Sequence, residues 1–202
     1  MKIFHQIPFN SQRDNKSFNN LRPASAQCFP TCAWMFMSFF CKDIDALDDR
    51  GLALFLNEVE RKIPGGSFAE DFIKANPNKL PKNVEVTSIY WDVIQYGINR
   101  MFDLYGVDKI ARWDEVAYER LPSILHSSPL IFGTKLTASG HIILLTGIDK
   151  QSDSFHVNDP YGNYTTGYKD LNGQTTYTAD LILQTGEACV GKKNMMRVMY
   201  AV

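Results

Sequence analysis

The stretch AQCFPTCAWM, residues 26–35, is the most informative in the chain. It leads into a run from Pro30 to Phe40 that is apolar on nearly every face, which predicts a buried helix rather than an amphipathic surface helix. Pro30 falls in the first turn of that helix, where its missing N–H group costs nothing. Residues 1–27 are polar after a short apolar start, which predicts a short strand and then a long loop. Cys28 therefore stands where a loop meets the start of a buried helix.

Cys28 is the candidate nucleophile. A helix N-terminus offers about half a positive charge and unpaired N–H groups, and both lower the pKa of a thiol and favour the reactive thiolate. A cysteine at such a place can also be a small buried hydrophobic residue without chemistry. Cys32 lies one turn further along, so we expect its side chain to face the core or to contact the same site.

A histidine and an acid follow much later in the chain. His141 comes directly after Ser139-Gly140 and opens an apolar strand, so its buried imidazole needs a polar partner. Asp159 follows the next predicted strand, and a hairpin would bring it beside the start of the first. The pair would supply the base and the orienting carboxylate that a cysteine nucleophile requires. The alternatives are a histidine bonded to backbone carbonyls, an ordinary Asp-Pro turn, and Asn158 as the orienting residue.

A cysteine hydrolase also needs a donor for the oxyanion of its tetrahedral intermediate. Gln12 and Gln27 are the candidates. Gln27 is adjacent to Cys28, so its side chain is expected to point away, whereas Gln12 can fold back on the long loop. Neither glutamine is singled out by the residues alone.

The remaining pattern predicts helices first and strands later. Helices are expected at residues 45–61, 67–86 (short, with loops), 90–105 and 114–125. Short runs rich in β-branched or large apolar residues predict strands at residues 130–133, 141–147, 154–158 and 194–202. We therefore expect one α+β domain, residues 1–202, in which a helical part over about 28–127 packs on a C-terminal antiparallel sheet over about 128–202.

The composition of the 202-residue chain fits a globular domain, with 45% hydrophobic residues. A formal net charge of −1 and the lack of a basic block argue against nucleic acid or an anionic membrane as the main partner. The longest apolar stretch is about half the roughly 20 residues that span a bilayer, so we expect no membrane span. The N-terminus carries no secretory signal pattern, which predicts a cytoplasmic location, with access to a cell wall only after release by a lysis system. The sequence assigns no oligomeric state.

The four cysteines, Cys28, Cys32, Cys41 and Cys189, are expected to stay reduced in that compartment. Cys28 and Cys32 have a spacing that could suit zinc, but no second Cys or His pair of ligand-like spacing follows. We therefore expect neither a metal nor another cofactor.

Three motifs carry a resemblance to a known family. They are Cys28-x-Pro30-Thr31-Cys32-x-x-Met35, Gly140-His141 with its apolar strand and Thr146-Gly147, and Asn158-Asp159-Pro160-Tyr161-Gly162. Together they resemble papain-like cysteine peptidases of the bacteriocin-leader-processing (double-glycine peptidase) type, specifically the standalone members found in bacteria and their phages. The opening residues 7–15 are similar to the start of those members. The resemblance covers roughly residues 7–35 and 128–162 and implies a papain-like α+β fold.

The resemblance implies a role for each candidate residue. Cys28 would be the nucleophile, His141 the general base, Asp159 its orienting acid and Gln12 the oxyanion donor. The chain departs from the family where Phe29 replaces a usual glycine, which could narrow the site, and where Cys32 replaces a common serine. A second register, with Cys32 as nucleophile beside Gln27 and Trp34, loosely matches papain itself.

The leading functional hypothesis is a cysteine peptidase or amidase that cleaves a peptide-type bond. Peptidoglycan peptides are a plausible substrate, as for a phage endolysin. The alternative is a catalytically inactive papain-like fold that binds a host protein, which Phe29 would favour. Acyl transfer to an amine instead of water is a third option that the sequence does not separate from hydrolysis.

Overall fold

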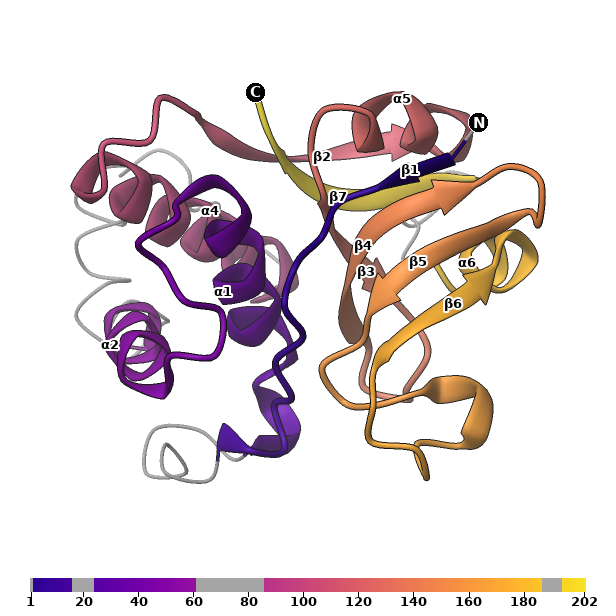
Figure 1. The fold of residues 1–202 in the computed structure, drawn as a ribbon, viewed down its shortest axis with the longest axis horizontal. Helices are drawn as coiled ribbons and strands as arrows, with labels where there is room; N and C mark the ends of the chain where they lie inside the picture. Colours follow the sequence, from indigo (N-terminus) through magenta and orange to yellow (C-terminus); the bar gives the residue numbers. More distant parts are fainter. Residues whose placement is uncertain (1, 16–23, 61–85, 187–193) are drawn as a thin grey trace.

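The structure, a computed structural model, describes residues 2–15, 24–60, 86–186 and 194–202. The helices α1 (Cys28–Phe40), α2 (Asp49–Glu60) and α4 (Val86–Leu104) gather on one side of a sheet (Figure 1). The N-terminal segment runs between these helices and the sheet. No helix in the described ranges is long and apolar enough to cross a membrane.

Helix α1 is buried on nearly all its faces, as its composition predicts. The ring of Trp34 packs against Phe55 of α2, with centroids 6.1 Å apart, and that of Phe36 stacks on Phe102 of α4 at 6.4 Å. Removing a buried ring of this size typically costs about 3–5 kcal/mol of stability. These contacts fix the direction of α1 and therefore the position of its first residue, Cys28.

Within the described ranges the sheet has seven strands, all paired antiparallel, and six of them follow the order β2-β7-β3-β4-β5-β6. The six are β2 (Ala111–Ala117), β3 (Leu130–Thr134), β4 (His141–Asp149), β5 (Ser154–Asn158), β6 (Gln174–Thr178) and β7 (Met195–Ala201). The seventh, β1 (Lys2–Phe4), pairs with the end of β4, where Phe4 lies opposite Gly147. The beginning of β4, at His141, lies opposite Thr134, the last residue of β3.

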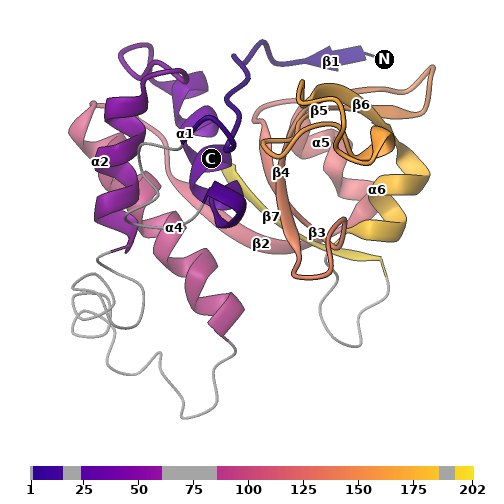
Figure 2. The same ribbon diagram turned by 90° about the horizontal axis from the view of Figure 1, so that it is seen from below.

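The central strands β3 and β4 are buried on both faces. Ile131 and Leu144 belong to the core shared with α1, α2 and α4, whereas Phe132 and Ile143 belong to a second core. The second core is covered by α5 (Leu121–Leu125) and α6 (Ala179–Thr185), so the sheet lies between two groups of helices (Figure 2). Burial on both faces explains why these strands read as continuous apolar runs in the sequence.

The predicted α+β class, with helices packed on an antiparallel sheet, is confirmed. The helix predicted over residues 90–105 is also observed; it begins earlier, at Val86, and is followed by Gly106 with a φ of 65°. The helix predicted over residues 45–61 is α2, and the short strand near the N-terminus is β1. The helix predicted within residues 67–86 lies almost wholly outside the described residues.

The helix predicted over residues 114–125 is wrong in its first part. Strand β2 pairs with β7 along its whole length, and only the 3₁₀ turn η3 (Tyr118–Arg120) and α5 follow it. Asp114 and Glu115 disfavour a strand by intrinsic propensity, but pairing with a neighbouring strand outweighs that preference. As a result, a strand of the sheet lies inside the part of the chain expected to be helical.

Candidate active site

Cys28 is the first residue of α1 and is partly exposed. Its thiol is hydrogen-bonded to His141. The sulfur also accepts hydrogen bonds from the backbone N–H groups of Phe29 and Ile142. The first of these N–H groups belongs to the open first turn of α1 and the second to β4, which packs on α1. The start of a helix and the start of a strand therefore meet at the sulfur atom.

His141 is the first residue of β4 and is almost fully buried. Its Nε2 atom is 2.7 Å from Asp159 Oδ1. Because Nε2 is engaged with the carboxylate, Nδ1 is the ring nitrogen left for the Cys28 thiol. Cys28, His141 and Asp159 thus form one continuous hydrogen-bonded chain.

Asp159 lies just beyond the end of β5 and has no exposed surface. Besides His141, its carboxylate accepts the O–H of Tyr177 at Oδ2, 2.7 Å away, and the backbone N–H of Tyr161 at Oδ1, 3.0 Å away. A side chain on Gly173, the residue before β6, would overlap the Asp159 carbonyl oxygen. Glycine at this position therefore lets the two backbone segments approach each other closely. A buried carboxylate with three donors is satisfied and held in one orientation.

The electrostatics favour a thiolate beside an imidazolium. Burial raises the pKa of the Cys28 thiol, but the hydrogen bond and charge of His141 and the two backbone N–H groups outweigh it and lower the pKa below its usual value. Burial likewise lowers the pKa of His141, but the hydrogen bonds to Asp159 and Cys28 raise it to about 9. Such a pair contains an activated nucleophile and, beside it, an acid for a leaving group.

The environment of Cys32, unlike that of Cys28, disfavours a thiolate. It is fully buried, and its thiol donates to the carbonyl oxygen of Ile142, 3.5 Å away. Burial raises the pKa of Cys32 well above its usual value, and the negative charges at Cys28 and Asp159 raise it further. A thiol with such a pKa stays protonated and is a poor nucleophile. This geometry disfavours the alternative register with Cys32 as nucleophile.

Gln12 and Gln27 are both fully buried near the start of α1. The Gln12 amide donates from Nε2 to the Ala24 carbonyl oxygen, 2.7 Å away, and its backbone N–H donates to the carbonyl of Pro160, the residue after Asp159, at 2.9 Å. The long loop therefore folds back toward the Asp159 end of the site, as expected for Gln12. Gln27 is the residue immediately before α1, and its backbone carbonyl accepts the N–H of Thr31.

Asn158 is directed elsewhere than its neighbour. Its Nδ2 atom donates to the Ile7 carbonyl oxygen, 3.2 Å away, and contacts the Met35 sulfur at 3.7 Å. Asn158 therefore anchors the N-terminal segment on the sheet, and Asp159 is the residue that bonds to His141.

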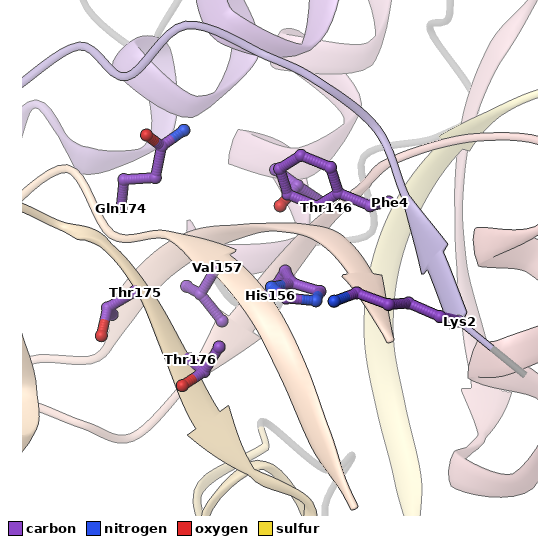
Figure 3. Close-up of a pocket in the computed structure, with 8 residues that line it drawn as sticks. All are labelled: Lys2, Phe4, Thr146, His156, Val157, Gln174, Thr175 and Thr176. Carbon is purple, nitrogen blue, oxygen red and sulfur yellow. The ribbon is translucent and has the colours of Figure 1, made fainter. Parts of the chain in front are cut away.

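The other histidines lie apart from this chain of residues. His5 bonds through Nε2 to the Leu125 carbonyl oxygen, and His126 is exposed. His156 packs edge-on against Phe4 and lines a hollow of about 430 Å³ on the sheet, where the Lys2 side chain extends toward it (Figure 3). The hollow is lined by Lys2, Phe4, Thr146, His156, Val157, Gln174, Thr175 and Thr176. Neither Cys28 nor His141 borders it.

Phe29 does not narrow the site with its ring. The side chain is buried in the helical core, and its ring lies 4.6 Å from that of Trp91 on α4. The backbone N–H of Phe29 donates to the Cys28 sulfur. The replacement of a usual glycine is therefore accommodated by the core behind the helix.

Several residues around the site had no role in the sequence-based prediction. Tyr177 was missed because β6 was not predicted, and Tyr161 and Tyr168 pack edge-on against His141 with ring centroids 6.2 Å away. Tyr161 stands inside the motif that begins at Asn158, so its position two residues after Asp159 was the one available signal. Among the described residues, no three His, Cys, Asp or Glu side chains gather to hold a metal ion.

Comparison with known proteins identifies one family. The model described as the Peptidase_C39 like family matches residues 4–182, which include Cys28, His141 and Asp159. No curated protein and no solved structure matches the chain.

Proposed function

Because the chain belongs to the Peptidase_C39 like family, we propose that it is a cysteine peptidase that cleaves a peptide-type bond with Cys28 as nucleophile, His141 as acid and base, and Asp159 as the residue that orients His141. The observation that carries the proposal is the hydrogen-bonded chain from the Cys28 thiol through His141 to the buried Asp159 carboxylate. The lowered pKa of Cys28 and the raised pKa of His141 support it.

The reaction proceeds in two halves. The Cys28 thiolate attacks the carbonyl carbon and forms a C–S bond, and His141 gives its proton to the leaving amine as the C–N bond breaks. Water then attacks the thioester while His141 takes its proton, which releases the acid and restores the starting pair. Asp159 orients His141 and stabilises the imidazolium in both halves.

The proposed oxyanion donors are the Gln12 side-chain amide and the backbone N–H of Cys28. Two features support Gln12: the loop that carries it folds back onto Pro160, and its side-chain Nε2, which donates one N–H to the Ala24 carbonyl oxygen, has a second N–H that can donate to an oxyanion. Donors of this kind, directed at the developing charge, are typically worth a factor of about 10² to 10³ in kcat.

For the substrate we propose the stem peptides or cross-bridges of peptidoglycan, with the protein acting as a bacterial or phage lysin. This part rests on the resemblance to standalone members of the family. The alternative of an inactive binding module was favoured by Phe29, and the burial of that ring against Trp91 takes away the reason for it.

The experiment compares Cys28→Ala with Cys32→Ala, a matched pair one helical turn apart. Turbidity loss of permeabilised Gram-negative cells and cleavage of a mixed library of quenched fluorescent peptides are measured for both variants and the parent. We expect Cys28→Ala to abolish cleavage and Cys32→Ala to retain it. Equal activity of Cys28→Ala and the parent would refute the proposed nucleophile.

Labelling with iodoacetamide at neutral pH adds a readout that needs no substrate. We expect Cys28 to be alkylated before Cys32, which should react only after unfolding, because of these two thiols Cys28 has the lowered pKa and the partial exposure. Loss of selective labelling in His141→Gln would tie the reactivity to the proposed pair.

A further inference from the structure

Arg13 carries a positive charge next to the proposed active site. The residue follows Gln12, and its guanidinium carbon lies 4.0 Å from the centroid of the Tyr161 ring. The Tyr161 ring in turn packs edge-on against His141. One aromatic ring therefore separates the guanidinium from the proposed catalytic imidazole.

The charge of Arg13 is not neutralised in the part of the chain that the structure describes. No carboxylate there lies within ion-pair distance of its guanidinium, in contrast to Arg112 with Asp114 and Arg197 with Glu115. Its Nε atom is shielded from solvent and has no hydrogen-bond partner among the described residues. A shielded donor without an acceptor costs free energy of folding. Such a group is uncommon in folded proteins and can mark a site where a ligand supplies the missing acceptor.

A second donor lies beside the same ring. The Tyr168 ring is 4.9 Å from that of Tyr161, and its hydroxyl is shielded and lacks a partner within the described residues. Burial and the charges of Asp159 and Cys28 raise the pKa of Tyr168, so the hydroxyl keeps its proton. Tyr168 also has a φ of 61°, a left-handed backbone conformation that residues other than glycine and asparagine rarely adopt. Such conformations concentrate at functional sites.

We propose that Arg13, with the Tyr168 hydroxyl as a second donor, binds a carboxylate of the substrate, so that the protein prefers peptides with an acidic group close to the bond it cleaves. The proposal rests on the proposed peptidase function. An arginine stacked on an aromatic face keeps the donors at its edge available, and the planar guanidinium matches a carboxylate with two parallel hydrogen bonds. The ring of Tyr161 fixes the distance between that carboxylate and His141.

The test uses paired libraries of quenched fluorescent peptides and the full chain. In one pair, each position near the cleaved bond carries either Glu or Gln, and in the other the peptides end in a free carboxylate or an amide. The two pairs distinguish an acidic side chain from a terminal carboxylate as the bound group. For the parent we expect a higher kcat/KM with the acidic member of one pair.

The decisive measurement is the ratio of kcat/KM for the acidic peptide to that for its neutral partner. We expect Arg13→Gln to lower this ratio about ten- to a hundredfold, because a hydrogen bond to a charged group is lost. Arg13→Lys is expected to give an intermediate ratio, and Arg13→Glu the lowest ratio, because a carboxylate at this position repels the acidic peptide. Tyr168→Phe should lower the ratio by a smaller factor.

Arg112→Gln is the matched control, because Arg112 is an exposed arginine on β2 that pairs with Asp114. It should leave the ratio unchanged. A ratio that is the same in the parent, Arg13→Gln and Arg13→Glu would overturn the Arg13 proposal even if Cys28→Ala is inactive. Activity that survives in Cys28→Ala would instead overturn the proposed function, so the two failures are distinguishable.

Discussion

The substitution Asp159→Asn removes the negative charge beside His141 and keeps the shape of the side chain. The pKa of His141 is raised from 6.5 to about 9, and a difference of this size corresponds to about 3 kcal/mol in favour of the imidazolium. Burial acts in the opposite direction, whereas the hydrogen bond and the charge of Asp159 raise the pKa. Without the charge we therefore expect the pKa of His141 to fall by about two units or more.

The consequence is measurable at Cys28. Its pKa is lowered in large part by the hydrogen bond and charge of His141, so a neutral imidazole lets that pKa rise. Below the pKa of the thiol, each unit of increase reduces the thiolate fraction about tenfold. We expect the rate of alkylation of Cys28 by iodoacetamide at pH 6 to fall about ten- to a hundredfold in Asp159→Asn, with the midpoint of the pH profile shifted upward.

The assay is a series of timed alkylations between pH 5 and about pH 10, read by mass spectrometry of the Cys28 peptide. Cys32 in the same digest reports unfolding, because its buried thiol becomes reactive only when the core opens. Asn158→Ala is the matched control, since Asn158 bonds to Ile7 and not to His141. If Asp159→Asn leaves the pH profile of Cys28 unchanged, the reasoning from charge to thiolate is refuted.

Three further substitutions test separate parts of the site. Tyr177→Phe removes one donor from the buried Asp159 carboxylate, so we expect the free energy of unfolding to fall by about 1–3 kcal/mol; an unchanged thermal midpoint would contradict this. Phe29→Ala leaves a cavity beside Trp91 and should cost about 3–5 kcal/mol in denaturant unfolding, and a large increase in the alkylation rate of Cys28 would show instead that the ring restricts the site. Gln12→Ala should reduce kcat about 10²- to 10³-fold with little change in KM, measured on a cleaved peptide; full activity would exclude Gln12 as oxyanion donor.

Three candidate residues were accessible from the sequence because each lies at a boundary. Cys28 begins a buried helix, His141 begins a strand buried on both faces, and Asp159 follows the strand that pairs with it. A polar residue at the edge of a long apolar run is conspicuous in a sequence, and antiparallel pairing then brings the start of one strand near the end of the next. Strand pairing therefore predicts that His141 and Asp159 lie close together, whereas the position of Cys28 beside them was expected from the three motifs and their resemblance to a known family.

Tyr177, which donates to Asp159, and strand β2 could not be predicted from the sequence in the same way. Tyr177 lies on β6, an edge strand in which it is the one fully buried residue among polar neighbours, so no apolar pattern marks the strand. Strand β2 was mistaken for a helix because its pairing with β7 comes from the far end of the chain, which local propensity does not record. Contacts between distant segments decide both cases.

The adjacent residues Asn158 and Asp159, at the end of β5, bond to different parts of the molecule. Successive side chains of an extended segment point to opposite sides, and here Asn158 bonds to the carbonyl of Ile7 while Asp159 bonds to His141. The first bond holds the N-terminal segment, which continues to Gln12 and Arg13 beside the site. A substitution of Asn158 should therefore weaken the proposed substrate contacts of that segment and leave the charge state of Cys28 unchanged. A substitution of Asp159 should instead change the charge state of Cys28, so the two neighbouring residues affect substrate binding and chemistry separately.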